Sequence, residues 1–368
     1  MTLTADYCSQ LWLMCHIEPL QYRGSVMNYR KFGRIDLKVS EIGLGTFHFG
    51  GPPKKWPEKI GWDGIDDSAA LNILTACLDL GINFIDTADL YGNGHSEELI
   101  GQAFKKHRDR IIICTKGGNR INSKGEWFKD FSQEWIQRAC EASLKRLQTD
   151  YIDIYLYHTP LNHIQFISEE FEVLDRLKTA GKIRSYGVSI GPVSDGLKLL
   201  DRGLADAIET TYNIIERDSE EKLFSAAQCQ KAGIIARVPL CTGFLAAKFT
   251  PDVTFAKNDF RSSLSQELVQ WLIQQAEKVR SLTTDGSRTS AQLALQFCLS
   301  TPAVSVVITG AKTIKQLRDN AKASELKPLS AEDRAYIKEV VPAVPGISEK
   351  IENQYDRFFE AAKRISSP

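Results

Sequence analysis

The sequence predicts one α/β domain folded as a (β/α)8 TIM barrel. Short apolar runs alternate with stretches whose apolar residues recur at helical spacing, and eight such strand–helix units follow one another along the chain. The runs are apolar along their length, as expected for parallel strands that are buried on both faces. Ionisable residues gather where three of these runs end, and a (β/α)8 barrel carries its catalytic groups at those ends.

Two segments precede the barrel. Residues 1–26 do not resemble the rest of the chain, and their apolar patch at 11–15 is too short for a signal peptide. We expect a disordered extension there, or a start codon set too far upstream, since Met27 begins a sequence that looks like a natural start. Residues 28–39 have the pattern of two short strands joined by a turn, which predicts an N-terminal β-hairpin.

The barrel units are expected in regular order. Helices begin at capping residues such as Asp66 and Ser132, and end at glycines such as Gly81 and Gly181. Because parallel strands need helical crossovers, eight units favour a closed barrel over an open doubly wound sheet. The expected strands lie at residues 42–46, 82–86, 111–115, 151–157, 184–189, 207–210, 234–238 and 304–308. The expected helices begin near residues 66, 96, 132, 168, 193, 219 and 314.

Two further segments complete the prediction. An insertion between strands seven and eight, at about residues 242–290, contains a helix expected at 265–282. A C-terminal tail, residues 342–368, contains another helix expected at 349–365. No linker or change of composition divides the chain, so we expect the barrel domain to span residues 27–341.

Composition argues against several classes of partner. Forty-six basic residues balance 46 acidic ones among 368 residues, so charge indicates neither nucleic acid nor an anionic membrane. No apolar stretch approaches the ~20 residues of a membrane span. The eight cysteines are scattered without a C-x-x-C pair, which favours buried thiols in a reducing cytoplasm over disulfides or a metal site.

Four ionisable residues define the candidate catalytic site. Asp86 ends the second expected strand, Lys116 follows the third, His158 follows the fourth, and Tyr91 lies in the loop after Asp86. An aspartate beside a buried strand needs a cationic partner, because burying it unpaired is costly, and Lys116 is the nearest candidate. Each of the four residues alone also fits a structural role; the four together favour catalysis.

The chemistry of these residues suits carbonyl reduction or its reverse, alcohol oxidation. The sequence lacks a Rossmann G-x-G-x-x-G fingerprint and a Walker A motif at the required spacings. A free tyrosine has a pKa of about 10. We expect the ammonium of Lys116, held by Asp86, to lower the pKa of Tyr91 so that it protonates a carbonyl oxygen. His158 would then hydrogen-bond the same oxygen.

Ordered motifs around these residues resemble the aldo-keto reductase superfamily over about residues 29–323. The motifs are Phe84-Ile85-Asp86-Thr87-Ala88-x-x-Tyr91-Gly92, Ser96-Glu97-x-x-Ile100-Gly101, Thr115-Lys116, and Ser143-Leu144-x-Arg146-Leu147-x-x-Asp150-Tyr151-Ile152-Asp153. The resemblance implies a (β/α)8 barrel that reduces aldehydes and ketones with NADPH, or sometimes NADH. It implies Tyr91 as proton donor, Lys116 and Asp86 as its tuning pair, and His158 as the residue that orients substrate.

The nicotinamide side resembles the family less closely. Ser189 matches a serine that binds the nicotinamide carboxamide, while Glu209 stands where a glutamine commonly holds the same amide. Arg237 replaces the aromatic residue that usually stacks on nicotinamide. We expect Arg237 and Glu209 to form an ion pair, with the guanidinium beside the nicotinamide ring. The other residues that the resemblance assigns to this side are Thr46, Asp86, Pro239, Leu240 and Gly243.

The segment from Gly310 to Asn320 resembles the part of the family that grips the adenosine 2′-phosphate and adenine. The residues assigned to this contact are Gly310, Lys312, Gln316, Asp319 and Asn320. Lys312 supplies a point charge suited to a phosphate monoester, which favours NADPH over NADH. A helix starting near Thr313 adds an N-terminal site for an anion.

These observations predict a cytoplasmic, NADPH-dependent oxidoreductase acting on small carbonyl compounds. Two alternatives stay open: a sugar or polyol dehydrogenase using NAD(P), and a non-catalytic subunit that binds the cofactor for regulation. The substrate depends on loops at 49–64, 117–131 and 241–262 and on the tail, and neither their shapes nor the oligomeric state follow from the sequence.

Overall fold

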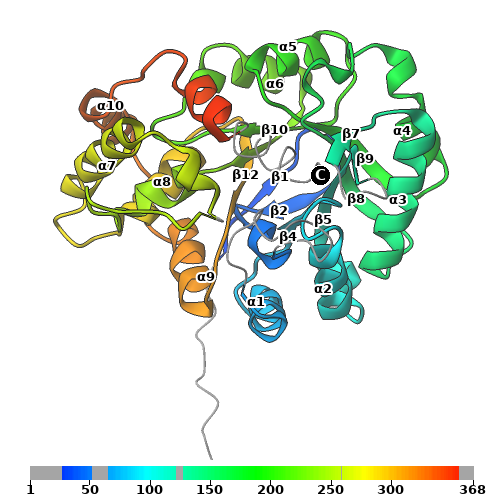
Figure 1. Ribbon diagram of the computed structural model, residues 1–368, viewed down its shortest axis with the longest axis horizontal. Helices are drawn as coiled ribbons and strands as arrows, with labels where there is room; N and C mark the ends of the chain where they lie inside the picture. The colour runs from blue at the N-terminus through cyan, green and yellow to red at the C-terminus, as the bar shows by residue number, and fades with distance from the viewer. Residues whose placement is uncertain (1–26, 52–64, 122–126, 258, 356–368) are drawn as a thin grey trace, which may run out of the picture.

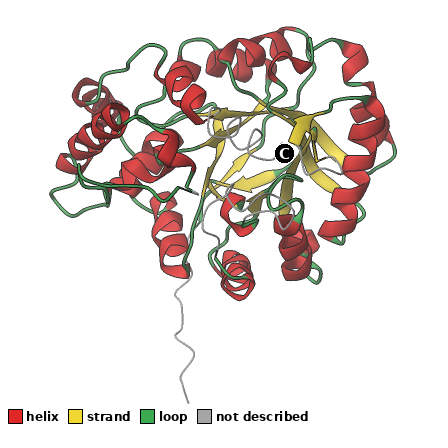
Figure 2. Ribbon diagram, viewed as in Figure 1, coloured by secondary structure: helices red, strands yellow, loops and turns green. Residues whose placement is uncertain are grey.

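The computed structural model describes residues 27–51, 65–121, 127–257 and 259–355. Eight parallel strands close a barrel in the order β10-β11-β12-β3-β4-β5-β8-β9, and helices surround it (Figures 1 and 2). The predicted (β/α)8 fold is therefore confirmed, with every expected strand present. The barrel strands are β3 (Ile42–Gly45), β4 (Phe84–Asp86), β5 (Ile112–Gly117), β8 (Ile152–His158), β9 (Ile183–Ser189), β10 (Ala207–Thr211), β11 (Gly233–Arg237) and β12 (Val304–Thr309).

Strand register brings the polar strand ends to one rim of the barrel. Asp86 lies opposite Gly45 of β3, and His158 lies opposite Ser189 of β9. Ser189 lies opposite Glu209 of β10 in turn. Because parallel strands share one direction, these side chains converge at the C-terminal end of the barrel.

The N-terminal hairpin, which the sequence predicted, closes the other end. It consists of β1 (Tyr29–Lys31) and β2 (Lys38–Ser40), which pair antiparallel. Phe32 and Val39 are fully buried and belong to the same apolar cluster as the barrel-lining Phe84 and Ile235. A Cβ atom at Gly233 would lie only 2.2 Å from the Phe32 ring, so glycine is required where the hairpin meets β11.

Most helices begin where a side chain caps them. Asp66, Ser132, Ser265, Thr289, Thr313 and Ser330 each accept a hydrogen bond from a backbone N–H of the first turn. The helices are α1 (Asp67–Asp79), α2 (His95–Phe104), α3 (Gln133–Leu147), α4 (Glu172–Thr179), α5 (Val193–Asp201), α6 (Leu223–Gln230), α7 (Gln266–Ser281), α8 (Ser290–Leu299), α9 (Ile314–Ala321) and α10 (Ala331–Val340). None of them, nor any other helix in the described ranges, is long and apolar enough to cross a membrane.

Three features were not expected from the sequence. Helix α8 packs against β12, α10 follows the last barrel helix, and the loop after β5 contains a second hairpin. That hairpin pairs β6 (Asn119–Ile121) with β7 (Trp127–Lys129). In the tail, residues 347–355 are helical, while the rest of the helix expected at 349–365 and the extension at 1–26 lie outside the described residues.

Candidate active site

The structure brings together the four residues on which the prediction rests. Lys116 Nζ lies 2.6 Å from Asp86 Oδ1, between neighbouring strands β4 and β5. It also lies 5.4 Å from the centre of the Tyr91 ring. The Tyr91 and His158 rings meet edge to face, with their centres 6.0 Å apart. The site is a compact cluster of one phenol, one ammonium, one imidazole and one carboxylate.

A second carboxylate joins this cluster. Glu209 Oε2 lies 3.3 Å from Lys116 Nζ, and Glu209 Oε1 accepts a hydrogen bond from Ser189 Oγ at 3.1 Å. Lys116 is completely buried, and Asp86 and Glu209 are each only 2% exposed. One buried ammonium is therefore shared by two buried carboxylates, which leaves an excess of negative charge.

Sharing of the Lys116 ammonium by two carboxyl groups affects the protonation of both Asp86 and Lys116. Burial and the charge of Glu209 raise the pKa of Asp86 to about 8, while Lys116 opposes the change. Burial by itself would lower the pKa of Lys116, but Asp86 and Glu209 raise it well above its ordinary value. Lys116 therefore stays a cation at every physiological pH.

The pKa of Tyr91 changes in the direction opposite to the expectation. Burial raises the pKa of the Tyr91 phenol above its ordinary value, and Asp86 adds to the increase. Lys116 lowers it, as predicted, but by less than burial raises it. The sequence could not show this, because burial depends on loop packing, including Phe47, whose ring centre lies 5.1 Å from that of Tyr91. Tyr91 is thus held as a neutral phenol with a proton to donate.

The proton on His158 can be placed from its neighbours. The indole Nε1–H of Trp127 donates to Oδ1 of Asn119 at 3.1 Å. The Asn119 amide must then present its Nδ2 to Nδ1 of His158, 2.9 Å away. Because Nδ1 accepts this bond, the neutral ring carries its proton on Nε2. His158 is thereby a hydrogen-bond donor at Nε2.

Charges around His158 keep its ring neutral. Burial lowers the pKa of His158 well below its usual value, and the cations of Lys129, Lys116 and Arg237 add to this. Lys129 also donates from Nζ to the backbone oxygen of His158 at 2.7 Å. The ring is therefore a neutral donor and not an imidazolium.

The expected ion pair between Glu209 and Arg237 is wrong. Arg237 Nη2 instead lies 3.1 Å from Oε1 of Glu352, a residue of the C-terminal tail, and donates to the backbone oxygen of Ile190 at 3.2 Å. Glu209 is paired with Lys116. Sequence reasoning missed Glu352 because it lies 115 residues beyond Arg237 along the chain.

Two buried polar atoms beside the cluster lack hydrogen-bond partners within the described part of the chain. They are Oε2 of Glu209, an acceptor that is ion-paired with Lys116 at 3.3 Å but accepts no hydrogen bond, and Nε of Arg237, a donor. A carboxamide has an NH2 donor and a C=O acceptor, so this pair suits the carboxamide of a nicotinamide. The two other residues assigned here have structural partners: Thr46 donates from Oγ1 to Asp86 O at 2.8 Å, and Ser189 donates to Glu209.

The loop after β11 has an unusual backbone. Its residues Pro239, Leu240 and Gly243 were assigned to the cofactor, and they lie directly after Arg237. The φ angles of Val238, Thr242 and Gly243 are 57°, 51° and 98°, in the left-handed region. Such conformations cluster at ligand-binding loops, where the surrounding structure holds them.

The adenosine segment gathers at the start of α9. Gln316 Oε1 accepts from the backbone N–H of Lys312 at 2.7 Å, and Asn320 Nδ2 donates to the backbone oxygen of Gly310 at 3.2 Å. Asn320 is buried and therefore shapes the loop, while Asp319 pairs with the exposed Lys315. Lys312 therefore lies beside a helix N-terminus. The lysine ammonium and the helix N-terminus together suit an anionic group.

Comparison with known proteins decides the family. The model of the Aldo/keto reductase family matches residues 41–342. The chain belongs to the aldo/keto reductase family. It is 34% identical to the uncharacterized oxidoreductase YqkF of Bacillus subtilis over 83% of this chain and 94% of that protein. It is 32% identical to the NADH-specific methylglyoxal reductase of Escherichia coli, over 85% of this chain and 98% of that protein.

A solved structure agrees with this assignment. The holo form of aldo-keto reductase AKR11C1 from Bacillus halodurans superposes with a TM-score of 0.73 at 34% identity, covering 86% of this chain and 97% of that one. Aldo-keto reductases are oxidoreductases, and this chain is an enzyme of that family.

His48 is a further residue of this aldo-keto reductase that lies beside the candidate adenosine segment. Its Nε2–H donates to the backbone oxygen of Ala311 at 2.6 Å, beside Gly310 and Lys312. Burial lowers the pKa of His48 to about 4, and the charge of Lys312 adds to the effect. The only sequence signal was its position, shortly after the end of the first barrel strand.

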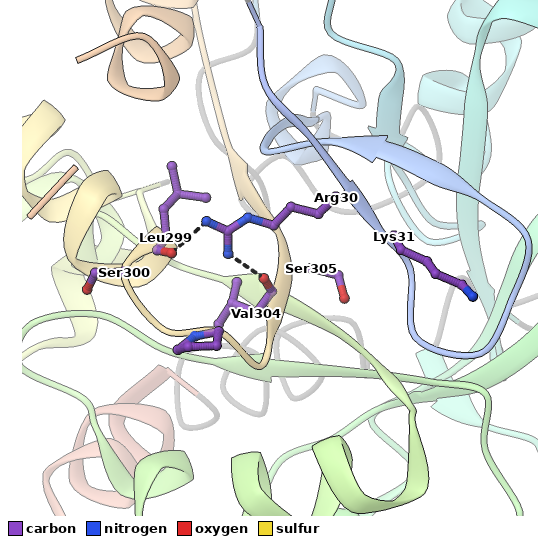
Figure 3. A pocket seen from close by; sticks show the side chains of 7 residues that line it. Arg30, Lys31, Leu299, Ser300, Val304 and Ser305 are labelled. Atoms are coloured by element: carbon purple, nitrogen blue, oxygen red, sulfur yellow. Dashed lines mark hydrogen bonds between the residues drawn. The ribbon is translucent and has the colours of Figure 1, made fainter. Parts of the chain in front are cut away.

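A separate cavity lies at the opposite end of the barrel. It has a volume of about 490 Å³ and is lined by residues of β1 and of the segment around β12 (Figure 3). Arg30 in this cavity donates to the backbone oxygens of Leu299 and Val304 at 2.7 and 2.8 Å. It also pairs with Glu41 at 2.7 Å. Its charge is therefore used in holding the hairpin against the barrel.

Proposed function

We propose that this aldo-keto reductase reduces aldehydes or ketones to alcohols with NADPH, using Tyr91 as the proton donor. The observation that carries the proposal is the cluster in which Tyr91 lies against both the Lys116 ammonium and the His158 ring. The bound cofactor supplies a hydride to the carbonyl carbon. The chain supplies the proton for the oxygen.

The residues divide this task between them. The neutral phenol of Tyr91 transfers its proton to the carbonyl oxygen, which becomes the hydroxyl of the alcohol. The Nε2–H of His158 donates a hydrogen bond to the same oxygen and orients it. Lys116 stabilises the phenolate that Tyr91 becomes, and Asp86 holds Lys116 in place by accepting a hydrogen bond from its Nζ at 2.6 Å.

Cofactor binding is proposed to use two sets of residues, one for the nicotinamide and one for the adenosine 2′-phosphate. Ser189, Glu209 and Arg237 would hold the nicotinamide carboxamide, since Oε2 of Glu209 and Nε of Arg237 make no hydrogen bond to any described residue. Lys312 and the N-terminus of α9 would bind the 2′-phosphate, which favours NADPH. The Escherichia coli relative is named for NADH specificity, so the two cofactors are compared directly in the test below.

A cytoplasmic location fits the cysteines. Six cysteines lie in the described ranges, and all are free thiols; Cys77, Cys114, Cys140, Cys241 and Cys298 are buried. Free buried thiols are typical of a reducing compartment.

The proposal is tested by following the oxidation of NADPH and of NADH at 340 nm with a panel of small aldehydes and ketones. Turnover is expected with at least one carbonyl compound, and a higher kcat/KM with NADPH than with NADH. Tight binding of NADPH without turnover of any compound would contradict a catalytic role. A higher kcat/KM with NADH than with NADPH would contradict only the role given to Lys312, and the reductase function would stand.

A further inference from the structure

The end of the described chain packs onto the rim of the barrel next to the candidate site. Residues 347–355 form a helical segment, coloured red in Figure 1 and lying near β10. Ile347 and Ile351 are 4% and 3% exposed and anchor this segment in the core. Tyr355 Oη lies 2.8 Å from Thr242 Oγ1, and its ring centre lies 4.7 Å from that of Phe260. The segment is thus fixed to the part of the chain after β11.

Glu352 extends from this segment across two strand ends. Its Oε1 lies 3.1 Å from Arg237 Nη2 and accepts from Thr211 Oγ1 at 3.4 Å. Thr211 and Arg237 are opposite one another in the register of β10 and β11. Glu352 therefore contacts the ends of β10 and β11, the strands that carry Glu209 and Arg237.

One nitrogen of the Arg237 guanidinium is hydrogen-bonded, whereas another has no hydrogen-bond partner among the described residues. Its Nη2 donates to Glu352 and to the backbone oxygen of Ile190. Its Nε is buried and has no hydrogen-bond partner among the residues that the structure describes, and the side chain is 23% exposed. The charge of Arg237 also acts on the pKa of Tyr91 and of His158, so it lies within electrostatic range of both.

Glu209 is the competing carboxylate for Arg237. Its Oε2 is ion-paired with Lys116 at 3.3 Å but accepts no hydrogen bond from any described residue, and its charge raises the pKa of Arg237. If Arg237 were released from Glu352, its guanidinium could turn to Glu209 and occupy the acceptor that a nicotinamide amide requires. The ion pair with Glu352 prevents this.

We propose that Glu352 is a positioning residue that orients Arg237, so that the C-terminal segment forms part of the nicotinamide subsite. This inference rests on the proposed function, since it assumes that a nicotinamide cofactor binds beside Arg237. Glu352 contacts neither the cofactor nor the substrate. It keeps the Arg237 guanidinium directed to the Glu352 carboxylate and away from Glu209.

The test compares two ligands in the variants Glu352→Ala and Glu352→Gln. NADPH occupies the whole cofactor site, whereas adenosine 2′,5′-bisphosphate occupies only the adenosine half. We expect Glu352→Ala to weaken NADPH binding about tenfold, the size of effect that follows loss of one hydrogen bond to a charged group. The bisphosphate should bind within about twofold of wild type. Glu352→Gln, whose amide oxygen can still accept from Arg237, should lose less.

A second comparison ties the effect to Arg237. Arg237→Met should weaken NADPH binding on its own, and adding Glu352→Ala to it should cause little further loss, because Glu352 acts through Arg237. Glu349→Ala is the matched control, since Glu349 lies in the same segment and is exposed. It should leave both affinities unchanged.

The outcomes separate this inference from the proposed function. Unchanged NADPH affinity in Glu352→Ala, with wild type binding and turning over NADPH, would overturn the inference alone. Equal weakening of both ligands would also overturn it, because it would indicate a general loss of structure. If wild type binds the bisphosphate but neither NADPH nor NADH, the proposed function fails and the inference fails with it.

Discussion

Asn119 Nδ2 donates a hydrogen bond to Nδ1 of His158 across 2.9 Å, and this bond decides which nitrogen of the imidazole can serve a substrate. Trp127 fixes the orientation of the Asn119 amide, because an indole N–H can only donate. The second hairpin, β6–β7, thus controls the chemistry of a residue at the end of β8. A neutral ring with its proton on Nε2 is the form that the proposed mechanism requires.

Replacing Asn119 with leucine should remove this control. The His158 ring could then adopt the other tautomer, and we expect kcat to fall by about tenfold to a hundredfold, the cost typical of small losses of orientation at a reacting centre. NADPH affinity should stay near that of wild type. Nitrogen-15 NMR of the labelled imidazole measures the tautomer directly, and a proton on Nδ1 in the wild-type protein would contradict the assignment.

Glu209→Gln should change how stability depends on pH. Burial and the charge of Glu209 raise the pKa of Asp86 to about 8 in the folded chain, against an unfolded value of about 3.9. The folded state therefore holds a proton that the unfolded state has released, and wild type loses stability as pH rises through this window to about 8. Removing the second carboxylate lowers the pKa of Asp86 and makes this loss smaller.

Denaturant unfolding at pH 6 and pH 9 measures the effect. The free energy of unfolding of Glu209→Gln should exceed that of wild type at pH 9 by about 1–3 kcal/mol. This is the usual cost of a buried charged group whose partners satisfy it only in part. The gain should be smaller at pH 6. The exposed Glu221→Gln serves as control and should change neither value. A Glu209→Gln variant that loses stability at pH 9 would contradict the sharing of Lys116 by two carboxylates.

Lys312→Ala should separate the two cofactors. Loss of a charged partner for the 2′-phosphate should weaken NADPH binding by roughly tenfold to a hundredfold, as expected for a hydrogen bond between charged groups. NADH lacks that phosphate and should bind as to wild type. Lys315→Ala removes a neighbouring lysine whose side chain is 86% exposed and paired with Asp319. It should change the affinity for neither NADPH nor NADH. Equal losses for both cofactors would place the phosphate elsewhere.

The strand pattern was readable because the barrel strands are buried on both faces. Each expected strand is present within a few residues, and four of the capped helices, α1, α3, α7 and α9, begin close to the predicted positions. Helix α8 was missed for a physical reason. Nearly every residue from Ser290 to Leu299 is buried, so the helix lacks the polar face that makes amphipathic spacing visible.

The four strand-end residues could be predicted, but their environment could not. Their types and spacing are local properties of the sequence, whereas the partners of Arg237 and His158 come from distant segments. Glu352 reaches Arg237 from the tail, and Asn119 reaches His158 from a hairpin inside a loop. The direction of the pKa of Tyr91 likewise depends on burial, which only the folded chain defines.

The most direct measurement is the turnover of Tyr91→Phe. This variant keeps the ring and removes only the proton donor, so kcat for carbonyl reduction should fall by about 10²–10⁴-fold, the range for loss of a general acid. The Kd for NADPH should stay within about twofold of wild type, since distant or uninvolved groups contribute little. Tyr336→Phe, at a tyrosine that is 58% exposed, should retain full activity. If Tyr91→Phe keeps more than half of the wild-type kcat, with the chemical step shown to limit turnover, Tyr91 is not the proton donor.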